Sequence, residues 1–240
     1  MRVRYALSLI LVLGCSGAAS SEPSILDEVE CVRTGAEIPP GLWEPAIEAY
    51  EAADAQSPPA PGSIVFIGSS SIFLWRTLAA DMAPLPVLNR GFGGSVIAHA
   101  THFVDRIIVP YEPRAVVLYA GDNDIALGGL SPDCTLRDYE AFVAKIRERD
   151  LMIPIYFISI KPSVFRENLW GEMRRANALI EARTMTEPSL HFMDVSESML
   201  DEDGRPIESL FVEDGLHLSP AGYELWTSIV RPVLIADLGD

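Results

Sequence analysis

IVFIGSSSIFLW (residues 64–75) is an apolar run that stops at one glycine and three serines and then becomes apolar again. The first part has the length of a buried strand, and the residues after the serines are typical of a helix. Three hydroxyls at such a junction have two interpretations. They can cap the helix, or one of them can be a nucleophile held at the end of a buried strand.

Four more stretches of the sequence have the length and apolar character of strands. Together with SIVFIG (63–68) they are LPVLNRG (85–91), AVVLYAG (115–121), IPIYFISI (153–160) and LHFMDV (190–195). Strands that are apolar on both faces are typical of a parallel sheet covered by helices on both sides.

The intervals between these strands carry helical patterns. Thr135 and Asp138 have the spacing of a capping box and predict the start of one helix, and Ser219 followed by Pro220 predicts the start of the last one. The predicted helices cover residues 44–56, 138–150 and 173–183 and a final stretch from residue 219. Strands that alternate with helices predict a doubly wound α/β domain.

Composition limits the classes of protein that this chain can belong to. The chain has 240 residues, of which 49% are hydrophobic, and its formal charge is -16. This suits one soluble domain with a sizeable core, and an acidic surface repels nucleic acid, so we expect no nucleic-acid partner. The break SPPAPG (57–62) separates a predicted arm and helix (21–62) from the main domain (63–240).

The N-terminus has the plan of a secretory signal peptide over residues 1–20. Two arginines precede an apolar stretch at residues 5–13, and small residues follow. The stretch is shorter than the roughly 20 residues that span a bilayer. VLGC (12–15) also resembles a bacterial lipobox, which would make Cys15 a lipidated membrane anchor of a periplasmic lipoprotein. The alternative is cleavage at residues 18–21, which would release a secreted protein.

Export makes the two remaining cysteines a candidate pair. In an oxidising compartment Cys31 and Cys134 can form a disulfide between the N-terminal arm and the domain. Two unpaired buried thiols are the alternative interpretation.

Polar or glycine-rich clusters follow three of the predicted strands and precede the last helix. They are GSSS (68–71), NRGFGGS (89–95), GDND (121–124) and EDGLHLS (213–219). Because the carboxyl ends of parallel strands meet at one edge of the sheet, we expect these clusters to converge there.

The residues of the four clusters are those that acyl transfer requires. Ser70 is the candidate nucleophile, His217 the base that accepts its proton, and Asp214 the group that orients His217. The backbone N–H groups of Ser70 and Gly94 and the side-chain amide of Asn123 are candidate donors to the oxyanion.

In these clusters the chain resembles the SGNH hydrolases, the GDSL-type esterases and lipases. FIGSSSI, NRGFGGS, GDND and DGLH match the four blocks of that family in order, and the resemblance covers residues 63–235. It implies a three-layer α/β/α, flavodoxin-like fold with a five-stranded parallel sheet, and hydrolysis of a small-molecule ester or thioester without metal or cofactor. Ser69 replaces the aspartate of the family's Gly-Asp-Ser. We expect activity to survive this change, because that aspartate takes no part in proton transfer.

Other interpretations of the same residues remain open. Asp122, Asp124, Asp214 and His217 could instead be ligands in a metal-dependent hydrolase. A second alternative is an envelope binding protein that kept the fold and lost the chemistry. Asp214 and His217 could also form a simple salt bridge within their loop.

The residues after the fourth strand offer candidates for substrate binding. Lys161 and Arg166 can bind an anionic part of a substrate, and Trp170 can stack on a sugar or acyl chain. A loop that caps the next helix, with a packed tryptophan, is the alternative. We expect a short-chain acyl or O-acetyl ester, because no long apolar lid segment lies between the strands, although lysophospholipids are hydrolysed on the same fold.

Overall fold

The computed structural model describes residue 31, residues 39–149 and residues 152–239 of the chain. The predicted signal peptide (1–20) with Cys15, and part of the predicted arm, lie outside these residues. Within the part that is described, no helix has both the length and the apolar character needed to cross a membrane.

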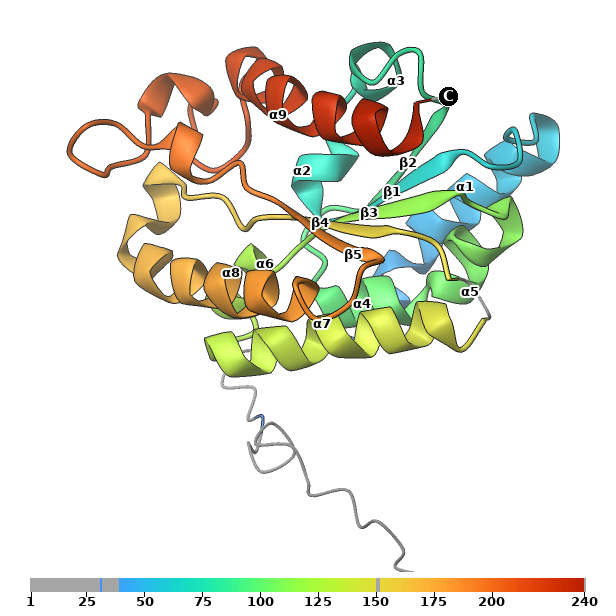
Figure 1. Cartoon of the computed structure of the whole chain (residues 1–240), viewed down its shortest axis with the longest axis horizontal. Helices are drawn as coiled ribbons and strands as arrows, with labels where there is room; N and C mark the ends of the chain where they lie inside the picture. Colours follow the sequence, from blue (N-terminus) through green and yellow to red (C-terminus); the bar gives the residue numbers. More distant parts are fainter. Residues whose placement is uncertain (1–30, 32–38, 150–151, 240) are drawn as a thin grey trace, which may run out of the picture.

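A single parallel sheet forms the centre of the molecule (Figure 1), as the sequence predicts. Its strand order is β2-β1-β3-β4-β5, the flavodoxin-like order. Gly68 at the end of β1 pairs with Gly91 on one side and Tyr119 on the other, so the central strands end at the same level. The strands are β1 (Ile64–Gly68), β2 (Val87–Gly91), β3 (Ala115–Tyr119), β4 (Ile155–Ile158) and β5 (Leu190–Met193).

Helices cover both faces of the sheet and give the three layers seen in Figure 1. On one face lie α2 (Ser70–Phe73), α3 (Leu78–Asp81) and α9 (Pro220–Leu238). The other face is covered by α1 (Glu44–Gln56), α4 (Ile97–His102), α5 (Val104–Ile107), α7 (Pro132–Arg147) and α8 (Trp170–Thr184), and the short α6 (Asp122–Ala126) follows β3.

The apolar runs of the sequence become two cores because successive side chains of a strand point to opposite faces. Val65 and Ile67 of β1 pack with α1, α4 and α7, whereas Ile64 and Phe66 pack with α2 and α9. Burial on both faces explains why these strands lack the polar alternation of a half-exposed sheet.

Two helix starts show how local signals compete. α9 begins as predicted, and the Ser219 hydroxyl accepts a hydrogen bond from the Gly222 amide. The prediction that a capping box at Thr135 starts the helix is wrong, because α7 begins earlier, at Pro132. Ser131 is its N-cap and accepts from the Cys134 amide, while Thr135 is buried inside the helix. Serine followed by proline is the stronger start signal at both helices.

Cys31 and Cys134 form a disulfide, with their Cα atoms 5.5 Å apart. Cys134 lies in the first turn of α7, so the bond ties the N-terminal arm to the helical layer that contains α7 and α8.

Candidate active site

The junction of β1 and α2 exposes one serine of the three. A Cβ atom on Gly68 would lie 1.8 Å from the Tyr119 carbonyl oxygen, so only glycine allows β1 to approach β3 here. Ser69 and Ser71 are buried, whereas Ser70 is partly exposed at the start of α2. Ser69 occupies the N-cap position, but its side chain makes no capping bond. The structure therefore does not support the capping interpretation of these hydroxyls.

The loop before α9 holds Asp214 and His217 in one local arrangement. The Asp214 Oδ1 atom accepts hydrogen bonds from the backbone amides of Leu216, at 2.8 Å, and His217, at 2.9 Å. Its Oδ2 atom lies 2.6 Å from His217 Nδ1. Burial raises the pKa of Asp214, but these three hydrogen bonds outweigh burial and lower the pKa to about 2. The carboxylate is therefore ionised at neutral pH.

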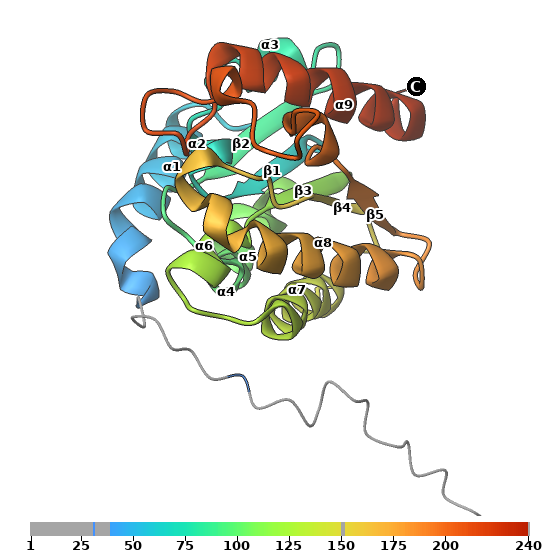
Figure 2. The ribbon, with the colours of Figure 1, turned by 90° about the vertical axis from the view of Figure 1, so that its left-hand side faces the viewer.

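His217 also contacts Ser70, which is distant from it in the sequence. Its Nε2 atom lies 3.1 Å from Ser70 Oγ, within hydrogen-bonding distance across 147 residues. A carboxylate on Nδ1 favours the tautomer whose Nε2 is free to accept a proton. The side chains of Ser70, His217 and Asp214 thus form a continuous chain of hydrogen-bonding groups at the carboxyl edge of the sheet, which faces the viewer in Figure 2.

The turn after β2 lies directly beside Ser70. A Cβ atom placed on Gly93 would be 3.9 Å from Ser70 Cβ, and one on Gly94 would meet no atom within 4 Å. Gly94 has φ +78°, which suits glycine, and its surface is open to a ligand. Trp43, a residue that sequence analysis missed, donates from Nε1 to the Gly93 carbonyl at 2.8 Å. No local pattern identifies this contact, because 50 residues separate its partners.

Asn123 lies at the start of α6 and is buried. Its Nδ2 atom donates to the Ser95 carbonyl at 3.0 Å, and its Oδ1 atom accepts from Arg166 Nη2 at 2.9 Å. A primary amide has two N–H donors, so one remains after the bond to Ser95. Because Ser95 directly follows Gly94, this hydrogen bond holds Asn123 beside the turn that contains Gly94.

The structure corrects the three candidate substrate contacts after β4. Lys161 is 1% exposed, Arg166 7% and Trp170 8%, so none of them offers an open surface. Lys161 Nζ lies 3.7 Å and Arg166 Nη1 lies 3.1 Å from Asp122 Oδ2, and burial lowers the pKa of Lys161. Trp170 belongs to the core beneath α8. The cations balance a buried carboxylate, which the sequence did not reveal because Asp122 is distant along the chain.

Asp124 contacts the start of α4 and does not join Asp122 in a metal site. Its Oδ1 atom accepts from the Ile97 amide at 3.0 Å, and complete burial raises its pKa to about 7. Among the residues that the structure describes, no three His, Cys, Asp or Glu side chains gather as metal ligands. The four residues of the metal-dependent alternative therefore make separate contacts here.

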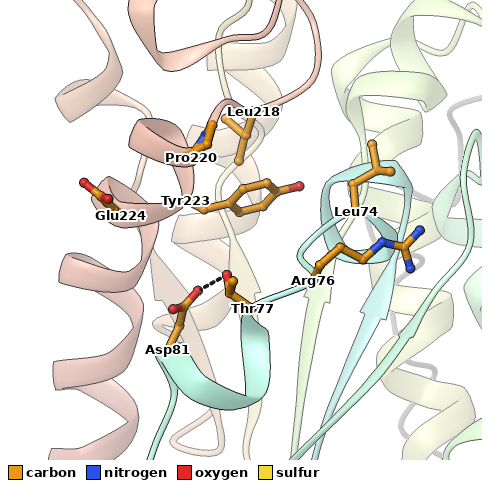
Figure 3. Close-up of a pocket in the computed structure, with 8 residues that line it drawn as sticks. All are labelled: Leu74, Arg76, Thr77, Asp81, Leu218, Pro220, Tyr223 and Glu224. Atoms are coloured by element: carbon orange, nitrogen blue, oxygen red, sulfur yellow. Dashed lines mark hydrogen bonds between the residues drawn. The ribbon is translucent and has the colours of Figure 1, made fainter.

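A mostly apolar cavity of about 390 Å³ adjoins the segments that carry Ser70 and His217 (Figure 3). Leu74, whose amide donates to the Ser70 carbonyl, lines one side. Leu218, which follows His217, and Tyr223 of α9 line the other, and the Tyr223 hydroxyl donates to the Ser71 carbonyl at 3.0 Å. Pro220 and four polar or charged side chains, Arg76, Thr77, Asp81 and Glu224, complete the lining.

The strand order and the site together define an SGNH-type α/β protein. A family model of GDSL-like lipases and acylhydrolases matches residues 68–225, and the chain belongs to this family of esterases and acylhydrolases. The resemblance seen in the four sequence blocks is thereby confirmed.

Individual relatives agree with this assignment. The bovine (Bos taurus) isoamyl acetate-hydrolyzing esterase 1 homolog is 29% identical over 186 residues, which cover 67% of this chain and 74% of the relative. A GDSL-like lipase from Bacteroides thetaiotaomicron has the same fold, with a TM-score of 0.67, 19% identity and coverage of 80% of this chain and 98% of that one. A carbohydrate esterase family 3 structure from Talaromyces cellulolyticus gives a TM-score of 0.57 at 14% identity, over 72% and 97% of the two chains.

Proposed function

We propose that the protein is a serine esterase that cleaves a carboxylic ester with Ser70, His217 and Asp214. The observation that carries the proposal is the continuous chain of contacts, 3.1 Å from Ser70 Oγ to His217 Nε2 and 2.6 Å from His217 Nδ1 to Asp214 Oδ2. Membership of an esterase and acylhydrolase family supports it.

In the proposed reaction Ser70 Oγ attacks the acyl carbon while His217 Nε2 accepts the hydroxyl proton. The carbon–oxygen bond to the alcohol then breaks, and the alcohol leaves with that proton. A water molecule, deprotonated by His217, then attacks the acyl carbon, and the bond from that carbon to Ser70 Oγ breaks. Ser70 Oγ takes the proton back from His217, and the carboxylic acid leaves. The ionised Asp214 stabilises the imidazolium in both halves. The N–H groups of Ser70, Gly94 and Asn123 stabilise the oxyanion.

Replacing each serine of the cluster in turn tests this proposal. We expect Ser70→Ala to lower kcat on p-nitrophenyl acetate by a factor on the order of 10⁵ to 10⁶, because the nucleophile is lost. Ser69→Ala and Ser71→Ala change neighbouring hydroxyls that are buried, so they are matched controls and should keep most of the activity. Loss of activity in a control but not in Ser70→Ala would refute the assignment.

For the substrate we propose a short-chain acyl ester. The bovine relative is named for the hydrolysis of an acetate ester, which supports this proposal. A series of p-nitrophenyl esters from acetyl to long fatty acyl tests this point. We expect kcat/KM to be highest for the short chains, and a maximum for long chains would contradict the proposal.

We also propose that the protein is exported and is anchored to a membrane through lipidated Cys15. The signal-like residues 1–20 and the disulfide between Cys31 and Cys134 support export, because disulfides persist in oxidising compartments. The intact mass of the mature protein tests the anchor. Acyl chains on an N-terminal Cys15 are expected, and a mature chain that begins after Cys15 would contradict it.

A further inference from the structure

Arg166 connects two consecutive residues of α6 through one buried guanidinium. Its Nη2 atom donates to Asn123 Oδ1 at 2.9 Å, and its Nη1 atom lies 3.1 Å from Asp122 Oδ2. The Nη1 atom makes no hydrogen bond, so its contact with Asp122 is an ion pair, and the hydrogen bond from Nη2 to Asn123 is the directional contact of the group. The ion pair with Asp122 therefore anchors the group that contacts Asn123.

This contact determines which way the Asn123 amide faces. Arg166 can only donate, so the atom of Asn123 that faces it must be the acceptor Oδ1. On the other side, Nδ2 donates to the carbonyl of Ser95. Rotating the amide by a half-turn would place N–H groups against the guanidinium and an oxygen against a carbonyl oxygen. Both pairs would be unfavourable, so the amide is held in one of its two orientations. The N–H of Nδ2 that does not bond to Ser95 therefore has a fixed direction.

The same segment also contacts the loop that holds the base. The amide of Phe165 donates to the Gly215 carbonyl at 3.0 Å, and Gly215 lies between Asp214 and His217. Two consecutive residues, Phe165 and Arg166, thus join the loop of His217 to the amide of Asn123. This segment therefore connects the loop with Asp214 and His217 to the buried Asn123, and the connection does not depend on the contact between Ser70 and His217.

We propose that Arg166 is a positioning residue for ester hydrolysis, which holds the Asn123 amide with its free N–H toward the oxyanion. The inference rests on the function proposed above. Arg166 does not touch the substrate in this role, because its side chain is buried and its contacts are with Asp122 and Asn123. Its contribution should therefore appear in the chemical step and should depend on Asn123.

The test is a double-mutant cycle between Arg166→Lys and Asn123→Ala, with kcat and KM measured on p-nitrophenyl acetate. Lysine keeps a positive charge beside Asp122, but a single ammonium cannot occupy the positions of both Nη1 and Nη2, so the hydrogen bond to Asn123 Oδ1 is lost. We expect Arg166→Lys to lower kcat by about tenfold or more, within the loss of about 10² to 10³ expected for Asn123→Ala. KM should change little. In the Asn123→Ala background the same replacement should cost no more than about twofold, because its target is gone.

Matched variants separate this role from a general loss of structure. Arg175→Lys changes an exposed arginine that pairs with Asp133, and it should leave kcat unchanged. Arg166→Met removes the charge as well, so its melting temperature should fall in addition to its kcat. Arg166→Lys keeps the charge beside Asp122, so its melting temperature should fall less than that of Arg166→Met, and kcat measured well below that temperature excludes unfolding as the cause of the loss.

Two results would overturn the inference alone. One is an Arg166→Lys enzyme with unchanged kcat. The other is a double variant whose kcat falls by the full product of the two single-variant factors, which would mean that Arg166 acts independently of Asn123. Equal ester hydrolysis by the unmodified protein and Ser70→Ala would instead refute the proposed function, and this inference with it.

Discussion

The two halves of the candidate site are built in opposite ways. The loop with Asp214 and His217 is partly exposed, with 48% of the Asp214 side chain accessible, and the hydrogen bonds of the Asp214 carboxylate come from residues two and three positions further along the chain. The half with Asn123 is buried, and its contacts to Ser95 and Arg166 span 28 and 43 residues. One half is a local turn, whereas the other exists only when several elements have packed together.

The electrostatics of the two halves differ in the same sense. Asp214 needs no cation, because hydrogen bonds from its own loop hold its pKa at about 2. Asp122 is buried and is balanced by Lys161 and Arg166 from the segment after β4. A buried charge requires such partners, whereas an exposed one is also stabilised by water. We therefore expect changes in the exposed half to act on chemistry alone, and changes in the buried half to act on chemistry and on stability.

The strongest test of the exposed half is Asp214→Asn. An amide on His217 Nδ1 would favour the wrong tautomer, so kcat should fall by a factor on the order of 10⁴. The melting temperature should stay nearly constant, because the side chain is exposed. Glu213→Gln, an exposed neighbour in the same loop, is the control and should be close to unmodified in kcat. A large drop in melting temperature for Asp214→Asn would break the comparison.

The buried half is tested by Asn123→Ala. The loss of one oxyanion donor should lower kcat by about 10² to 10³. The Arg166 guanidinium and the Ser95 carbonyl would also lose a partner, so a lower melting temperature should accompany the kinetic effect. Steady-state kinetics and thermal unfolding of the same sample measure both quantities. Full activity in this variant would remove Asn123 from the proposed oxyanion hole.

The pH dependence of kcat/KM gives a smaller effect that sharpens the comparison. With a pKa of about 2, Asp214 stays ionised above about pH 4. Protonation of this carboxylate should therefore contribute nothing to any loss of kcat/KM between about pH 8 and about pH 4. An NMR titration of the Asp214 carboxyl carbon, run beside the kinetic profile, measures this, and a carboxyl group that gains its proton above about pH 4 would contradict it.

The smallest effect on catalysis is expected for Asp124→Asn, which acts on stability instead. The folded pKa of about 7 lies above the ordinary value of 3.8, so between these values the folded state binds the extra proton. This group therefore destabilises the fold progressively as pH rises from about 4 to about 7. An asparagine side chain at this position cannot ionise, so the variant should be more stable at about pH 8, with kcat within about twofold.

Denaturant unfolding at about pH 5 and about pH 8 measures this difference. The control is Asp203→Asn, which replaces an exposed aspartate in a turn. An Asp124→Asn protein that loses as much stability as the unmodified protein between the two pH values would show that the buried carboxylate is not responsible.

Much of the fold could be predicted from local patterns. All five predicted strands are in the sheet, and each is shorter than predicted. The apolar runs of β1, β3 and β4 are clear because these strands are buried throughout, whereas β2 and β5 are only partly buried. The start of α9 at Ser219 and Pro220 followed from capping chemistry. The start of α7 was missed because Thr135 fits a capping pattern as well as Ser131 does, and only the packing of the helix shows which one is buried.

For the site, spacing was informative where the contacts are short along the chain. The pairing of Asp214 with His217 follows from a separation of three residues in one turn. The roles of Lys161, Arg166 and Trp170 could not be predicted, because exposure of a long side chain depends on what covers it. The partners of Lys161 and Arg166, Asp122 and Asn123, lie in α6, far from them in sequence, and Trp170 is covered by a core to which most elements contribute.

By itself, therefore, the amino-acid sequence determined the alternation of strands and helices, the four clusters and the Asp214–His217 pair. These depend on periodicity and on contacts within a few residues. The tertiary structure alone decided which serine is exposed, that His217 reaches Ser70, and that Arg166 is directed at Asn123 rather than at solvent. Such contacts form only when the packing of the sheet and its two helical layers brings together segments that the chain keeps far apart.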